Sequence, residues 1–340
     1  MVVAWTLFLV SGAIVFIASR GLVKASDEIS DRTGISRTFA GLLLLAIATS
    51  LPEVATGATA VSLVGSVDLA AGDIFGSNLF NLMIIGVLDL SQRDYALLAS
   101  VSKDLLLPTL LSGLIAVLAA VFIVLHIAGM SFTTSILSLF SPSLLGFYFF
   151  TMFVLWRREY PSVKHRSAPI TESDSKTLKG PLLLYLVSAT AVVGAGFGLA
   201  SSGETIADLT GWGSSFVGTF FVAMSTSLPE LATCFAALKI GAKDLAIGNV
   251  IGSNLFNIGV VTFTDDLLYP GDVFGGFLGS ISPVHLITVF AGIGMTATIW
   301  FTLALSSRRS RTRHLAPESI ILLVIFLLAN YLIFASAPMS

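Results

Sequence analysis

Ala48-Thr-Ser-Leu-Pro-Glu53 is a polar stretch within an apolar run, and it recurs almost unchanged as Ser225-Thr-Ser-Leu-Pro-Glu230. Each copy contains one carboxylate, two hydroxyls and a proline. Each is followed by a second shared motif, Gly76-Ser-Asn-Leu-Phe-Asn81 or Gly252-Ser-Asn-Leu-Phe-Asn257. Two matched clusters of oxygen ligands in an apolar chain indicate one cation site built from two half-sites.

The composition is that of a membrane protein. The chain has 340 residues, of which 55% are hydrophobic and 11% charged, whereas soluble domains typically carry about 25% charged residues. The mean hydropathy of +0.93 indicates several membrane-spanning segments. The net charge of −2 argues against nucleic acid as a partner. Cys234 is the only cysteine, which excludes an intrachain disulfide and a cysteine-rich metal site.

Ten apolar segments are each close to the length of about 20 residues that spans a bilayer. The predicted transmembrane segments are 2–20, 37–63, 69–90, 105–127, 134–156, 181–201, 212–238, 243–264, 281–304 and 315–336. The polar stretch 157–180 divides them five and five and is predicted to be a solvated linker.

The basic residues give the chain an orientation. All 18 Lys and Arg residues fall in, or at the edges of, alternate connections between these segments. If the segments cross the membrane in turn, every basic residue lies on one face. The positive-inside rule makes that face cytoplasmic. We therefore expect a cell (inner) membrane protein with a cytoplasmic linker and both termini extracellular.

The two halves of the chain repeat. Leu9-Val-Ser11 matches Leu186-Val-Ser188, and the shared motifs follow at nearly the same offset. Five spans per half is an odd number, so the second copy enters the membrane inverted. The predicted fold is an all-α polytopic membrane protein with ten transmembrane helices in two inverted five-helix repeats. The first repeat covers 1–156 with its motif region at 46–81, and the second covers 181–340 with its motif region at 223–257.

Glu53 and Glu230 lie well inside their predicted helices. An acidic residue at the bilayer centre costs about 2.5–3.5 kcal/mol on insertion scales, so it is a functional hypothesis by default. The alternative is a protonated carboxyl that only links two helices by a hydrogen bond. A glutamate occurs at the same position of both motif copies, and this recurrence favours a functional role for Glu53 and Glu230.

Helical spacing places the neighbouring oxygen atoms beside the carboxylates, because residues three and four apart share a face. Pro52 and Pro229 also deprive the carbonyls of Ala48 and Ser225 of their helical partners. Helices two and seven are therefore expected to be broken, which can direct carbonyl oxygens at a cation. The candidate side-chain ligands are Thr49, Ser50, Glu53, Ser77, Asn81, Thr226, Ser227, Glu230, Ser253 and Asn257.

These ligands are all oxygen atoms, which suit hard cations such as calcium. Soft or borderline metals prefer Cys or His, and none of the four histidines falls in the clusters. Two carboxylates can neutralise one divalent ion or serve several monovalent ions, which is a basis for competition and exchange. Asp73 is either an accessory acid near the ion path or a hydrogen-bonded structural residue.

Two further groups of residues have structural interpretations. The glycines at 72, 76, 248 and 252 are expected to let segments three and eight pack closely against two and seven. Asp68, Asp89 and Asp244 lie near segment ends and are expected to be solvated.

The paired motifs resemble those of the sodium/calcium exchangers in the cation/calcium antiporter superfamily, of the prokaryotic type. The resemblance covers essentially the whole chain and implies that the ten residues above are the ion ligands. It also implies carbonyl ligands at Ala46 and Ala223. The family often has Gly where Ala48 and Ser225 stand, and Asp73 replaces a usual Asn. The potassium-dependent branch prefers Asp at position 257, so Asn257 implies transport without potassium.

The expected function is secondary antiport of sodium against calcium by alternating access at a midplane site. A proton-coupled or other divalent-cation exchanger is the alternative. A cation channel is disfavoured because two inverted half-sites in one chain are typical of carriers. An intramembrane hydrolase would need a nucleophile with a base, which is not visible, so we expect no enzyme activity and no cofactor. The expected partners are calcium, sodium and the lipid bilayer, with a monomer as the expected state.

Overall fold

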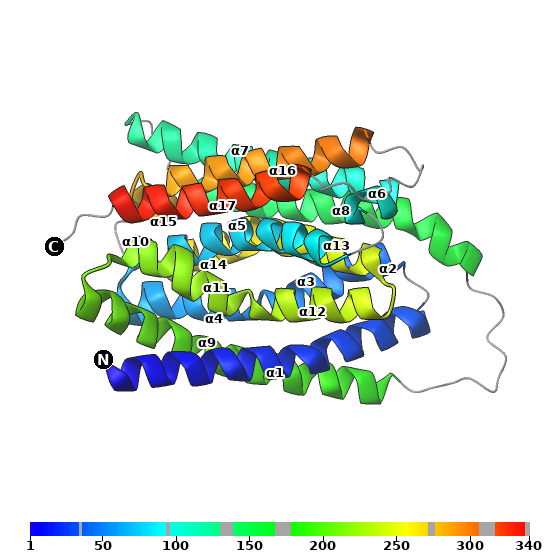
Figure 1. The fold of residues 1–340 in the computed structure, drawn as a ribbon, viewed down its shortest axis with the longest axis horizontal. Coiled ribbons are helices and arrows are strands. Elements are labelled where there is room, and N and C mark those ends of the chain that lie inside the picture. Colours follow the sequence, from blue (N-terminus) through cyan, green and yellow to red (C-terminus); the bar gives the residue numbers. More distant parts are fainter. Residues whose placement is uncertain are drawn as a thin grey trace.

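The computed structural model describes residues 1–33, 36–92, 96–129, 139–166, 178–270, 276–305 and 317–336, and all regular structure within these ranges is helical. The long helices lie side by side along the long axis of the molecule (Figure 1). The first half contains α1 (Val2–Thr33), α2 (Arg37–Ala40), η1 (Gly41–Leu45), α3 (Ala46–Thr49), α4 (Leu51–Thr59), η2 (Ala60–Val64), α5 (Val67–Ser91), α6 (Leu97–Ser100), η3 (Lys103–Leu105), α7 (Leu106–Ile127) and α8 (Phe140–Arg166).

The second half repeats this order of long and short helices. It contains α9 (Lys179–Thr210), α10 (Ser214–Phe216), η5 (Val217–Val222), α11 (Ala223–Thr226), α12 (Leu228–Lys239), α13 (Lys243–Phe256), η6 (Asn257–Val261), α14 (Thr262–Leu268), α15 (Gly276–Ser280), α16 (His285–Leu305) and α17 (Pro317–Ser336). The segments η1, η2, η5 and η6 are π-helical, whereas η3 is a short 3-10 helix.

Nine helical runs in the described parts of the chain are long and apolar enough to cross a membrane. They coincide with nine of the ten predicted segments. The predicted segment 134–156 corresponds to α8, which begins at Phe140 and runs on to Arg166. The first part of the predicted linker 157–180 is therefore helical and continues α8. Residues 167–177 of that linker lie outside the described ranges.

Both motif-bearing helices are interrupted at the motif. In the first, α3 ends at Thr49, and Ser50 has φ −90° and ψ 8° before α4 begins. In the second, Ser227 has φ −85° and ψ 7° between α11 and α12. Each proline then lies in the first turn of the following helix, where a missing N–H removes no intrahelical bond. The break turns the side chains before and after it toward a common centre.

Helices α5 and α13 form the centre of the bundle. Every residue of α13 from Leu245 to Phe256 is buried, and α5 is buried along most of its length. The outer helices present apolar side chains outward, as shown by Leu9 of α1 at 66% exposure, Leu183 of α9 at 64% and Leu327 of α17 at 64%. Such an apolar outer face suits contact with lipid.

Glycines bring the central helices into backbone contact across the two halves. A Cβ at Gly76 of α5 would lie 2.5 Å from the carbonyl oxygen of Thr219, and a Cβ at Gly252 of α13 would lie 2.4 Å from that of Leu42. Segment three thus packs on segment seven, and segment eight packs on segment two. The predicted packing role of these glycines is confirmed. Each central helix makes this contact with the motif-bearing segment of the other half of the chain.

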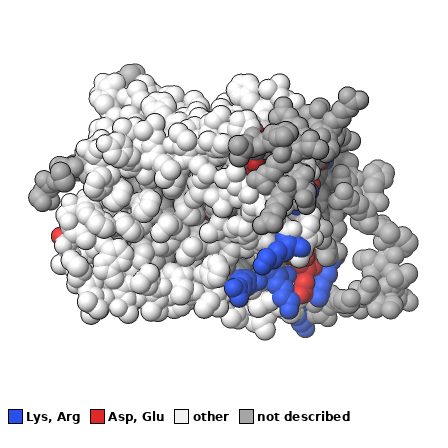
Figure 2. All heavy atoms as spheres, in the orientation of Figure 1, with Lys and Arg blue, Asp and Glu red and all other residues white. Residues whose placement is uncertain are grey.

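The ends of the bundle differ in charge. Helix α1 begins, and α17 finishes, at the same end of the bundle (Figure 1). The visible Lys and Arg side chains gather at the opposite end (Figure 2). The basic residues at positions 93, 176, 308, 309, 311 and 313 lie outside the described ranges.

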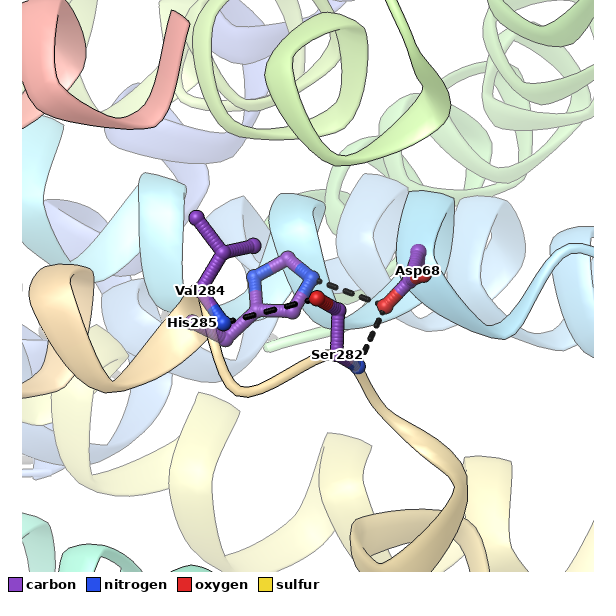
Figure 3. Close-up of polar contacts among 4 residues, drawn as sticks. All are labelled: Asp68, Ser282, Val284 and His285. Atoms are coloured by element: carbon purple, nitrogen blue, oxygen red, sulfur yellow. Dashed lines mark hydrogen bonds and ion pairs between the residues drawn. The ribbon is translucent and has the colours of Figure 1, made fainter. Parts of the chain in front are cut away.

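Aspartates hold several helix ends. Asp68 and Asp244 keep part of their surface exposed, but each also accepts a hydrogen bond from a distant backbone N–H. Asp68 Oδ1 accepts a hydrogen bond of 2.7 Å from Ser282 N and lies 3.2 Å from His285 Nε2 (Figure 3). Asp244 Oδ1 accepts one of 2.7 Å from Ser102 N. Asp68 thus satisfies a backbone N–H just before α16, and Asp244 satisfies one just before η3. The sequence could not reveal these contacts because the partners are distant along the chain.

Asp89 is the third aspartate predicted to be solvated, and it is buried. It accepts hydrogen bonds from Leu97 N and from the Ser319 hydroxyl, the latter at 2.6 Å. Asp89 therefore joins the end of α5 to α6 and to the start of α17.

Candidate ion-binding site

The ten predicted ligands meet in the middle of the bundle. They come from the two broken helices, from α5, and from α13 with the adjoining η6. Every one of them is fully buried: Thr49, Ser50, Glu53, Ser77, Asn81, Thr226, Ser227, Glu230, Ser253 and Asn257. The structure thus brings together all the residues that the two motifs contributed.

The two broken helices exchange hydrogen bonds at their break points. The Ser50 hydroxyl donates to Glu230 Oε1 at 3.3 Å, and the Ser227 hydroxyl donates to Glu53 Oε1 at 3.4 Å. Ser253 also donates to Glu230 Oε1, at 3.1 Å. Each carboxylate is therefore oriented by a serine of the opposite half, which makes the cluster one unit and not two separate sites.

The threonines bind the central helices of the opposite half. Thr226 Oγ1 lies 3.1 Å from Ser77 Oγ, and Thr49 Oγ1 lies 3.4 Å from Ser253 Oγ. One turn earlier on each central helix, Asp73 and Asn249 take matching positions. Asp73 Oδ1 accepts from Thr226 at 2.8 Å, and Asn249 Oδ1 accepts from Thr49 at 3.2 Å.

The paired asparagines are oriented by two residues that the sequence reasoning missed. Asn81 Nδ2 donates to Asn254 Oδ1 at 3.1 Å, and Asn257 Nδ2 donates to Asn78 Oδ1 at 3.1 Å. Asn78 and Asn254 are the third residues of the two Gly-Ser-Asn motifs, so their recurrence was the available signal. Because Asn254 and Asn78 accept from these amide nitrogens, the amide oxygens of Asn81 and Asn257 point away from Asn254 and Asn78.

The ten candidate ligands include four buried acceptor oxygens for which the structure shows no hydrogen-bond donor. They are Glu53 Oε2, Glu230 Oε2, Asn81 Oδ1 and Asn257 Oδ1. Buried polar atoms are nearly always paired, because desolvation without a partner costs about 1–3 kcal/mol. Two carboxylate and two amide oxygens without donors are the ligand types that sodium or calcium would satisfy.

Asp73 lies within the cluster. Its Oδ1 accepts from Thr226 and, at 3.3 Å, from Ser77, while its Oδ2 has no partner. Asp73 is therefore hydrogen-bonded to two candidate ligands, as a structural residue would be. It also adds an acid beside them, as an accessory acid would.

The two predicted carbonyl ligands lie at the same place. The carbonyl of Ala46 accepts from Ser50 N at 3.0 Å, and that of Ala223 accepts from Ser227 N at 3.0 Å. Thr226 also reaches the Ala223 carbonyl at 3.2 Å. A carbonyl oxygen has two lone pairs. A cation could therefore bind these carbonyls if the threonine hydroxyls, which reach Ala46 at 3.5 Å and Ala223 at 3.2 Å, turn to their other partners.

Histidine and cysteine stay outside the cluster where they are described. His126 packs against Gly279, and His285 contacts Asp68, while the side chains of the other two histidines are not described. Cys234 is buried and its thiol donates to the Ala246 carbonyl at 3.4 Å. Among the described residues, no group of three or more His, Cys, Asp or Glu side chains is arranged to hold a metal.

The fold and the cluster define a class: a polytopic helical membrane protein whose buried centre is lined with the oxygen donors that hard cations prefer. The family model described as sodium/calcium exchanger protein matches residues 3–157 and 180–335. The chain belongs to that family, which confirms the resemblance inferred from the motifs, and the family is one of transporters.

Similar proteins cover nearly the whole chain. The candidate antiporter CaxA of Alkalimonas amylolytica is 31% identical in an alignment 344 positions long that covers 97% of this chain and 99% of the relative. The sodium/calcium exchanger MaX1 of Methanosarcina acetivorans is 28% identical in an alignment 333 positions long that covers 86% of this chain and 91% of the relative. A solved structure of the sodium-calcium exchanger NCX_Mj, soaked with 10 mM Na+ and zero Ca2+, matches with a TM-score of 0.66 at 24% identity and covers 97% of this chain and 98% of its own. That likeness shows a shared fold.

Proposed function

We propose that the protein is a secondary active antiporter that exchanges sodium for calcium by alternating access at the central cluster. The observation that carries this proposal is the set of four buried oxygens without donors, contributed equally by the two halves. Membership of the sodium/calcium exchanger family supports sodium and calcium as the ions.

The ligand set is the one predicted from the sequence. Glu53 and Glu230 supply the negative charge, and Asn81 and Asn257 supply amide oxygens beside them. The hydroxyls of the four motif residues Thr49, Ser50, Thr226 and Ser227, those of Ser77 and Ser253, and the carbonyls of Ala46 and Ala223 complete the shell. Calcium takes six to eight oxygen ligands in flexible geometry, and this number of donors suffices.

Exchange follows from the sharing of two carboxylates. One calcium ion neutralises both Glu53 and Glu230, whereas sodium ions must occupy the same oxygens singly. The two kinds of ion therefore compete for one cluster. Because an empty pair of buried carboxylates is costly, the ion-free protein is disfavoured and one ion is released as the other arrives.

The architecture that we propose is ten transmembrane helices in two inverted five-helix repeats, at 1–156 and 181–340. The nine membrane-length runs, together with α8, support the count. The reciprocal contacts of Ser50 with Glu230 and of Ser227 with Glu53 support two matched half-sites. Inverted repeats with a site at their interface are a recurrent basis of alternating access.

The orientation that we propose places both termini outside the cell and the linker 157–180 in the cytoplasm of a cell (inner) membrane protein. The gathering of visible basic side chains at the end opposite the termini supports it.

A proton-coupled exchanger is the second candidate function. Asp73 favours it, because a third acid in the cluster can carry a proton in exchange for an ion. A flux measurement separates the two. Purified protein in liposomes is loaded with sodium and diluted into sodium-free buffer with radioactive calcium, and the same liposomes are then given a pH gradient at equal sodium.

We expect calcium uptake under the sodium gradient and little under the pH gradient alone. Uptake driven by the pH gradient and indifferent to sodium would replace sodium antiport by proton antiport. Liposomes with Glu53→Gln protein are the control for leakage, because that change leaves the bundle intact and removes one of the two site charges.

A further inference from the structure

Helix α14 carries a buried carboxylate that neither motif includes. Asp265 is fully buried, and neither of its carboxylate oxygens has a hydrogen-bond partner. It occupies the space beside Gly57 of α4, because a Cβ on that glycine would lie 2.4 Å from Asp265 Oδ2. An ionised carboxylate without a partner in a bilayer is strongly disfavoured, so this group must be neutralised by a proton or by a cation.

Asp265 has no counterpart in the first half of the chain. The neighbouring Asp266 accepts hydrogen bonds from Phe277 N and from the Ser141 hydroxyl, just as Asp89 accepts from Leu97 N and from Ser319. Asp266 and Asp89 are thus matching helix anchors. The residue before Asp89 is the apolar Leu88, whereas the residue before Asp266 is Asp265.

A π-helical turn produces this difference. Nine positions separate Asn257 from Asp266, whereas eight separate Asn81 from Asp89. The extra residue is accommodated in η6 (Asn257–Val261), while α5 runs without interruption over the matching part. Single π-helical turns inside α-helices are frequent at functional sites. Here the insertion shifts the register so that an acid faces α4 while the anchor is retained.

Asp73 connects this acid to the central cluster. Helix α14 packs against both α4 and α5, and α4 packs against α5, so Asp265, Asp73 and Glu53 lie on three elements in mutual contact. Asp73 is close enough for electrostatic interaction with each of the other two acids. Asp73 Oδ1 accepts from Thr226 and Ser77, which are candidate ligands of the cluster. Its Oδ2 has no partner, so three buried oxygens without donors belong to Asp73 and Asp265 together.

We propose that Asp265 and Asp73 form an accessory site for one sodium ion, beside the central cluster and between α4, α5 and α14. A cation between the two acids removes their mutual repulsion and supplies a ligand for the three unpartnered oxygens. The identity of the ion rests on the proposed function, while the existence of the site rests on the geometry of Asp265.

The test is the number of sodium ions bound by the purified protein in detergent, measured with radioactive sodium at saturating concentration and without calcium. We expect Asp265→Asn to bind one sodium ion fewer per chain than the wild type. Gly57→Ala should lose the same ion without any change of charge, because its methyl group displaces the carboxylate. This second variant keeps the proposal testable if Asp265→Asn does not fold.

Asp266→Asn is the matched control, because it removes a negative charge from the adjacent position of the same helix and retains an acceptor for Phe277 N. Its sodium stoichiometry should equal that of the wild type. Equal stoichiometry in Asp265→Asn and the wild type, which is the result for a carboxyl that only holds a proton, would overturn the site. So would an equal loss in Asp266→Asn. Failure of the proposed function is seen separately, as absence of sodium-driven calcium uptake by the wild type.

Discussion

Replacing Glu230 by Gln removes one of the two glutamate charges of the cluster with almost no change of shape. In the wild type, Glu230 Oε1 accepts from Ser50 at 3.3 Å and from Ser253 at 3.1 Å, while Oε2 has no donor. The amide oxygen of Gln can accept both bonds, and its nitrogen takes the place of the oxygen that has no donor. We therefore expect the folding stability to change by no more than about 1–2 kcal/mol.

The loss of ion binding should be much larger. Two unit charges 4 Å apart attract by about 4 kcal/mol at an effective dielectric constant near 20, and a divalent ion doubles this to about 8 kcal/mol. Desolvation of the charges offsets part of the attraction. If about half survives, the calcium affinity falls by about 1,000-fold, since each 1.4 kcal/mol is tenfold. Sodium, with half the charge, should lose correspondingly less.

Calorimetric titration of the purified variant with calcium measures this loss, and its thermal unfolding curve shows whether it is folded. Glu53→Gln, at the matching position, should behave in the same way. A folded Glu230→Gln protein that binds calcium within tenfold of the wild type would refute the assignment of Glu230 as a ligand.

Four other predictions concern topology, ion choice and packing. A cysteine introduced at position 170 in a Cys234→Ser background should be labelled only from the cytoplasmic side, and labelling from outside intact cells would overturn the orientation. Transport should proceed equally well when choline replaces potassium on both sides of the membrane. A strict potassium requirement would contradict the inference from Asn257 that potassium is not transported. Asn257→Asp should shift sodium–calcium competition and make transport more sensitive to pH, because crowded carboxylates favour protonation; an unchanged flux profile would place Asn257 outside the site. Gly252→Ala should destabilise the protein by about 1–3 kcal/mol, because its Cβ would lie 2.4 Å from the Leu42 carbonyl oxygen. Gly146→Ala, where a Cβ meets open space, is the control in the same thermal unfolding assay, and equal melting of the two variants would contradict the close packing.

The candidate site was predictable because its residues recur as two copies of a short motif. Recurrence identified Glu53 and Glu230 as a pair, and helical spacing placed the hydroxyls of Ser77 and Ser253 on the same faces as the asparagines. The break at each proline followed from the missing N–H. The same recurrence was present at Asn78 and Asn254, but their positioning role depends on contacts between halves that spacing along one helix does not reveal.

Other features depend on partners far away along the chain. Asp89 resembles a solvated residue at a helix end until Leu97 and Ser319 are placed beside it. The π-helical turn of η6 shifts the helical register by one residue. The hydrophobicity of a membrane-length segment does not reveal such a turn. The polar composition of 157–180 indicates a linker but does not show where the preceding helix ends. Residues 157–166 continue α8, because Lys, Arg and Glu have favourable helix propensity.

The most direct test of a single shared site is to locate the bound ion. Crystals of the protein grown with calcium, or soaked with strontium for its stronger anomalous signal, should show one dominant site between Glu53 and Glu230. Its distances to carboxylate and amide oxygens should be about 2.3–2.6 Å, and the peak should fade as sodium is raised. A dominant peak away from both glutamates, or one that high sodium leaves unchanged, would contradict the proposal that one cluster serves both ions.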